Sequence, residues 1–65
     1  MKTIEVYPLA YTLYWRARLA ENYEIREDGM TDESAVSLLL VKLRHMGMSD
    51  RRADYNIVIS YSPRE

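Results

Sequence analysis

The chain contains no cysteine, which excludes a disulfide framework and any metal site built from thiolates. A reducing compartment suits such a chain, so we expect a cytoplasmic protein. The longest unbroken apolar run, residues 38–41, is far too short to cross a bilayer, and no membrane association is expected. Only two glycines and two prolines occur among the 65 residues, which leaves little room for long loops.

Phenylalanine is also absent, and the aromatic residues are six tyrosines and one tryptophan. Tyrosine joins apolar area to a hydroxyl group that needs water or a polar partner, so it suits an interface or the rim of a core. The formal net charge of −1 gives no bulk electrostatic argument for binding nucleic acid or an acidic membrane. Acidic residues nevertheless gather in residues 21–33 and basic residues in residues 42–52.

Alternating apolar and polar residues predict strands in the first part of the chain. Residues 2–7 alternate, and Pro8 should end this strand because it has no amide hydrogen. Residues 9–19 are apolar at every odd position, which favours a second strand, although a helix here would also collect apolar side chains on one side. A turn at residues 21–22 then returns the chain as a strand over residues 23–27.

A helix is the most clearly marked element of the sequence. Thr31 or Asp32 is a suitable N-cap for a helix that ends at His45 or Met46, and Gly47 is placed to cap its C-terminus. Acidic residues lie in its first turn and basic residues in its last turn, as the helix dipole favours. Leucine and valine side chains recur at helical spacing on one face, which should pack on the sheet.

Residues 48–54 form a polar connection, and the alternation of residues 55–61 predicts a last strand. The chain is therefore predicted to be a single α+β domain over residues 1–65, a small two-layer fold with an antiparallel sheet (order β-β-β-α-β) and one helix on one face. One helix covers one face only, so the other face should remain open. The predicted open face carries Glu5, Tyr7, Tyr14, Arg16, Arg18, Asn56 and Val58.

The residues needed for catalysis are scarce. The single histidine, His45, lies at the expected end of the helix, where a favourable contact with the helix dipole explains it without catalysis. The acidic residues lack the ligand spacing of a calcium loop, and no glycine-rich phosphate loop is present. We therefore expect a non-enzymatic protein with no catalytic residue, no metal and no cofactor.

Protein binding fits the composition best, because tyrosine, tryptophan and arginine are enriched at the centres of interfaces. We expect a small inhibitor or regulator of a larger protein, such as a phage or mobile-element protein directed against host defence, or an antitoxin-like protein. A homodimer, formed through the sheet face or a free strand edge, is a further expectation. The predicted partner-binding residues are Tyr7, Tyr14, Arg16 and Arg18, with an acidic secondary patch of Glu24, Glu27 and Asp28.

Nucleic-acid binding is the alternative function, because aromatic side chains on an open sheet can stack single-stranded bases while arginines hold phosphates. A second phosphate surface would consist of Lys42, Arg44, Arg51 and Arg52. The near-neutral charge speaks against this alternative. A purely structural interpretation is that Glu5 pairs with Arg16 or Arg18 across the strands while the later basic residues are solvated.

The segment DGMTDESAVSLLLVKL, residues 28–43, resembles the start of the helix in the small antitoxin domain of the HicB family, where a similar acidic, threonine-containing turn precedes the helix. The resemblance in arrangement covers about two thirds of the chain, but the proline- and glycine-containing stretch that follows the family's second strand is missing here. It implies a protein that neutralises a toxin partner.

Overall fold

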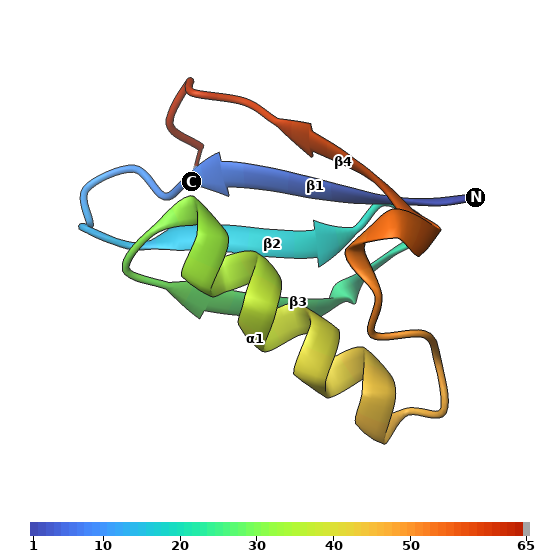
Figure 1. Cartoon of the computed structure of the whole chain (residues 1–65). Helices are drawn as coiled ribbons and strands as arrows, with labels where there is room; N and C mark the ends of the chain where they lie inside the picture. Colours follow the sequence, from blue (N-terminus) through green and yellow to red (C-terminus); the bar gives the residue numbers. More distant parts are fainter. Residues whose placement is uncertain (65) are drawn as a thin grey trace.

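The structure is a computed structural model that describes residues 1–64. Its strands form one four-stranded sheet in the order β3-β2-β1-β4, and the helix packs on one face of it (Figure 1). The predicted α+β fold with two layers is therefore confirmed. The elements in chain order are β1 (Lys2–Pro8), β2 (Trp15–Leu19), β3 (Asn22–Gly29), α1 (Asp32–His45), the short 3-10 helix η1 (Arg52–Asp54) and β4 (Tyr55–Ile59).

The sheet is mixed. Strand β2 pairs antiparallel with both β1 and β3, whereas β4 pairs parallel with β1. The parallel pairing arises because α1 carries the chain back along the sheet, so that β4 runs in the same direction as β1. The predicted polar connection after the helix contains η1, and β4 ends at Ile59 rather than at Tyr61.

The first half of the predicted second strand is a loop, so that part of the prediction is wrong. Strand β2 begins only at Trp15, and Tyr11 has a left-handed backbone with φ 64°. The Thr12 hydroxyl organises this loop, because it donates to the Leu9 carbonyl and accepts from the Tyr14 amide, both at 3.1 Å. The alternating sequence gave a wrong prediction here because the Leu9 carbonyl and the Tyr14 amide bond to a side chain rather than to a neighbouring strand.

The turn between β2 and β3 is tight, and Leu19 pairs with Asn22 across it. The register shifts between Arg18 and Leu19, so β3 contains extra residues at this end. The Asn22 side chain supports the turn by accepting a hydrogen bond from the Glu24 amide at 3.1 Å. Such a bulge changes which residues of β3 lie beside those of β2, and alternation alone cannot reveal it.

The predicted helix is confirmed at both ends. Thr31 is the N-cap and forms a reciprocal capping box with Ser34, in which each side chain accepts from the other residue's backbone amide at 3.0 Å. Met46 is the C-cap, and Gly47 follows it with φ 80°, a conformation that glycine adopts without strain. These caps fix where the helix starts and ends over the sheet.

The hydrophobic core lies between α1 and the strands beneath it. The helix packs mainly on β3 and β2, contacts β1 less, and leaves β4 at the margin of the fold (Figure 1). Within residues 1–64, no helix is both long enough and apolar enough to span a membrane. The buried core residues are Ile4, Val6, Ala17, Leu19, Ala35, Val36, Leu39, Leu40, Leu43 and Tyr55.

Candidate binding face

The sheet face opposite α1, called the open face below, centres on Arg18. Its guanidinium donates to the Glu5 carboxylate at 2.9 Å across the β1–β2 pair. The same guanidinium lies 3.6 Å from the ring centroid of Tyr23 and 4.9 Å from that of Tyr7. An arginine that is paired with a carboxylate and stacked on two aromatic rings is held in one orientation. The structural interpretation, in which Glu5 pairs with Arg16 or Arg18, is thus confirmed for Arg18.

Tyr7 lies on the predicted face, but it is not accessible. Only 2% of its surface is exposed, and the guanidinium groups of Arg18 and Arg64 lie 4.9 and 4.8 Å from the centroid of its ring. Arg64 reaches it because the chain after β4 returns to β1, where the Arg64 amide donates to the Pro8 carbonyl at 2.9 Å. The expectation that Tyr7 is exposed on the open face is therefore wrong, and its ring contacts the two arginines instead.

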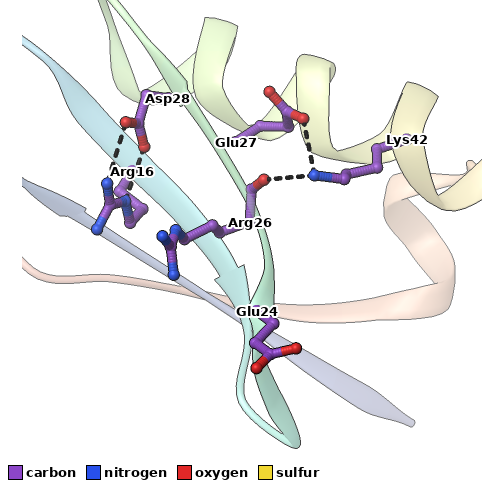
Figure 2. Close-up of a pocket in the computed structure, with 6 residues that line it drawn as sticks. All are labelled: Arg16, Glu24, Arg26, Glu27, Asp28 and Lys42. Carbon is purple, nitrogen blue, oxygen red and sulfur yellow. Dashed lines mark hydrogen bonds and ion pairs between the residues drawn. The ribbon is translucent and has the colours of Figure 1, made fainter.

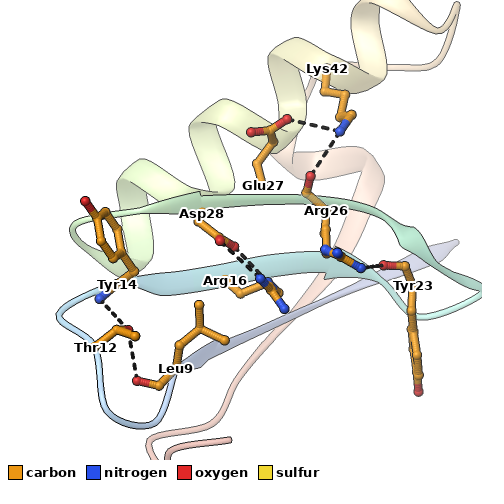
Figure 3. Close-up of polar contacts among 9 residues, drawn as sticks. All are labelled: Leu9, Thr12, Tyr14, Arg16, Tyr23, Arg26, Glu27, Asp28 and Lys42. Atoms are coloured by element: carbon orange, nitrogen blue, oxygen red, sulfur yellow. Dashed lines mark hydrogen bonds and ion pairs between the residues drawn. The ribbon is translucent and has the colours of Figure 1, made fainter. Parts of the chain in front are cut away.

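Tyr14 precedes β2 and is not part of the arginine stack. Its side chain is 48% exposed, but Figure 3 shows its ring and that of Tyr23 pointing in opposite directions from opposite ends of the face. Tyr23, which is 52% exposed, is the exposed tyrosine beside Arg18. The alternation of residues 9–19 had predicted Tyr14 for this position beside the arginines. The sequence signal for Tyr23 was its position just after the β2–β3 turn, next to the end of the arginine-bearing strand.

Arg16, the next arginine along β2, is bound to β3. Its Nε and Nη2 donate to the two carboxylate oxygens of Asp28 at 2.8 and 3.1 Å (Figure 3). This hydrogen bonding raises the pKa of Arg16 above its ordinary value, against a smaller opposing effect of partial burial. The bidentate pair joins opposite register positions, Arg16 on β2 and Asp28 on β3, and so fixes the register of these strands.

The predicted acidic patch is not uniformly acidic. Its three carboxylates line an open hollow together with three basic side chains, and Asp28 is already paired with Arg16 (Figure 2). Glu27 points toward the helix and pairs with the Lys42 ammonium at 3.1 Å. Glu24 alone among the three makes no ion pair with a described residue. The hollow therefore presents balanced charge instead of a negative surface.

Three of the four basic residues predicted as an alternative phosphate surface contact polar partners within the chain. Lys42 is engaged at the β3 edge, and Arg44 pairs with Asp50 at 3.7 Å. Arg52 donates to the Ser37 hydroxyl at 3.2 Å, and Arg51 is exposed at the start of η1. The structure thus distributes these side chains among local partners.

His45 is the last residue of α1 and is exposed, and it lies where the helix dipole favours a basic side chain. Among residues 1–64, no three histidine, aspartate or glutamate side chains gather at a point where they could hold a metal ion.

No protein-family model matches this chain, and neither a curated protein nor a solved structure matches it. The resemblance to the antitoxin domain of the HicB family therefore rests on the arrangement of the sequence alone.

Proposed function

We propose that this protein binds another protein through the open face of its sheet and acts as an inhibitor or regulator of that partner. The observation that carries the proposal is the stack of Tyr23 on Arg18, with Glu5 holding the guanidinium from the other side. Tyrosine and arginine are the residue types that supply most of the binding energy at interfaces. The helix lies on the other face, so this stack is open to a partner.

Preorganisation is the physical advantage of this arrangement. A long arginine side chain loses rotamer freedom when it is immobilised at an interface, at a cost of about 0.5–1.5 kcal/mol. Arg18 is already immobilised by Glu5, Tyr7 and Tyr23 before any partner arrives. Binding therefore costs less entropy at this side chain than at a free surface arginine.

The ion pairs favour a protein partner over nucleic acid. Arg16 and Arg18 would have to give up Asp28 and Glu5 to neutralise phosphates. Carboxylates beside the arginines would also repel a polyanion, whereas a protein surface can offer donors to the same carboxylates.

The test compares alanine substitutions of two tyrosines, one stacked on Arg18 and one exposed in a loop. Affinity capture from the native cell identifies the partner, and calorimetry with the purified partner then gives the dissociation constant. Tyr23→Ala should weaken binding by about 2 kcal/mol, or about thirtyfold, because its exposed ring is stacked on Arg18. Tyr11→Ala is the matched control, since Tyr11 is 94% exposed in the loop before β2 and should leave the dissociation constant unchanged.

Equal affinity of the Tyr23→Ala variant and the original chain, with folding confirmed by circular dichroism, would contradict this site. A single-stranded oligonucleotide that binds the original chain, loses affinity steeply with added salt and fails to bind the Tyr23→Ala variant would assign the face to nucleic acid instead.

A further inference from the structure

Strand β4 is a free edge of the sheet that lacks the usual protection. Residues 55–61 read YNIVISY and contain neither a charged residue nor proline. Val58 is 48% exposed on the open face and Ile59 is 39% exposed on the helix side, at the outer margin of the sheet (Figure 1). Proteins commonly protect such edges with lysine, proline, a bulge or a covering segment, because an exposed edge pairs with other strands.

The unused backbone groups of β4 are regularly placed. The Ser60 amide donates to the Val6 carbonyl at 2.8 Å, which shows the side of the strand that faces β1. Backbone groups point alternately to the two sides of a strand, so the amide and carbonyl groups of Ile57 and Ile59 point outward. The Tyr55 carbonyl points the same way, while its amide is bonded within η1.

The other edge of the sheet, β3, is protected by charge. It carries Glu24, Arg26, Glu27 and Asp28 within a few residues. Lys42 Nζ donates to the outward Arg26 carbonyl at 3.2 Å and pairs with Glu27 at 3.1 Å, so a helix side chain occupies a group that a new strand would need (Figure 2). Charged side chains thus protect the β3 edge of the sheet, whereas the β4 edge has no such protection.

We propose that a second copy of this chain pairs antiparallel with β4, so that two sheets join into one continuous sheet across a twofold axis. With Ile57 on the axis, its amide and carbonyl exchange bonds with the partner's Ile57. Each Ile59 amide then meets the partner's Tyr55 carbonyl. On the open face, Val58 lies opposite the partner's Asn56.

The chemistry of the edge fits a second copy in particular. A twofold axis sets each residue of β4 against a residue of the same strand, so any charge near the axis would meet a like charge. Residues 55–61 contain no charged residue, so the two copies of the strand can pair without charge repulsion. Outward backbone groups lie on both sides of Ile57, so the register with Ile57 on the axis pairs all of those in residues 55–59 except the Ile59 carbonyl, whose counterpart, the Tyr55 amide, is bonded within η1.

Such a dimer has a defined geometry. The axis of an antiparallel edge pairing is perpendicular to the sheet, so both helices lie on one side and both open faces on the other. Helix α1 lies over the far strands and stays clear of the junction. The inference does not rest on the proposed function, because it uses the edge of β4 and not the arginine stack.

Sedimentation of the whole chain over a wide concentration range tests the proposal, and the original chain should show a reversible monomer–dimer equilibrium. Val58→Lys should weaken self-association by about tenfold or more, because it places a charge beside the twofold axis. Leu38→Lys is the matched control: Leu38 is 46% exposed but lies on α1, so this variant should dimerise as the original chain does.

Amide hydrogen exchange locates the interface without a substitution. The Ile57 and Ile59 amides should exchange fast in dilute solution and slowly in concentrated solution. A monomer at every concentration, dimers that survive Val58→Lys, or concentration-dependent protection confined to other strands would each overturn the proposal. The two proposals fail separately, because Tyr23→Ala should leave the dimer intact, and the protection of the Ile57 and Ile59 amides reports on the dimer without any change to the arginine stack.

Discussion

Strands β1 and β4 lie side by side and run in the same direction, but the helix protects only one of them. Val6 on β1 and Ile59 on β4 are register partners with side chains on the same face, yet Val6 is 1% exposed and Ile59 is 39% exposed. An α-helix with its side chains is about 10–12 Å across, whereas neighbouring strands are about 4.8 Å apart. One helix therefore covers about two strands well, and a four-stranded sheet keeps an uncovered margin.

The position of the helix decides which edge remains available. Helix α1 begins directly after β3, and Gly29 at the end of β3 allows the first turn of the helix to approach closely. This places α1 over the β3 side and brings Lys42 to the β3 edge. The edge near the helix is consequently closed by a charged side chain, and the edge far from the helix keeps apolar side chains and unused backbone groups.

The largest expected effect is on the free energy of unfolding, from a substitution in the part of the sheet that the helix covers. Ile4→Ala should lower the free energy of unfolding by about 3 kcal/mol, because Ile4 is fully buried beneath the helix and its loss leaves a cavity. Ile59→Ala makes the same change on the same face of the uncovered strand and should cost less than about 1 kcal/mol. Urea unfolding at low protein concentration measures both values.

Similar losses for these two variants would show that β4 is packed as firmly as β1, and the comparison between the two strands would fail.

A smaller effect tests the close approach of α1 to β3. A Cβ atom added at Gly29 would lie 2.6 Å from the Ala35 amide nitrogen and 2.9 Å from the Ser34 carbonyl carbon, so Gly29→Ala must displace the first turn of the helix. We expect a loss of about 2 kcal/mol in the free energy of unfolding. Gly47→Ala has open space around it and only its positive φ to oppose it, so it should cost about 1 kcal/mol.

Thermal unfolding ranks the two glycine variants, and a larger loss for Gly47→Ala than for Gly29→Ala would contradict the close packing of the helix start.

The sequence predicted the helix and its caps well, because Thr31, Gly47 and the charged end residues act locally. Strands β1 and β4 were also predictable, since their alternation reflects one buried and one less buried face. The open face followed from the presence of a single helix. The identity of Arg16 and Arg18 as residues of that face was therefore predictable as well.

The rest of the site depends on contacts between residues far apart in the chain. Tyr7 is buried because Arg64 returns to it from the other end of the sequence, and alternation within β1 carries no information about that. Tyr23 meets Arg18 because of the bulge near the β2–β3 turn, which changes the register. The loop at Tyr11 and Tyr14 has the alternating sequence of a strand, but the left-handed backbone of Tyr11 and the hydrogen bonds of the Thr12 hydroxyl distinguish it from one.

The smallest expected effect concerns Tyr55, the one residue of β4 that belongs to the buried core cluster. It tests how β4 is held against the rest of the fold. Its hydroxyl donates to the Ser49 carbonyl at 2.6 Å, and burial, with the nearby Asp54 charge, raises its pKa above the ordinary value of 10.0. The folded state then holds this proton more tightly than the unfolded state does. The resulting stability is complete below about pH 10 and is lost as the pH rises through the folded pKa.

Urea unfolding at about pH 8 and about pH 11 measures this effect. Between these two pH values the free energy of unfolding should fall less for Tyr55→Phe than for the original chain. Equal losses would mean that Tyr55 does not anchor β4 through its protonated hydroxyl.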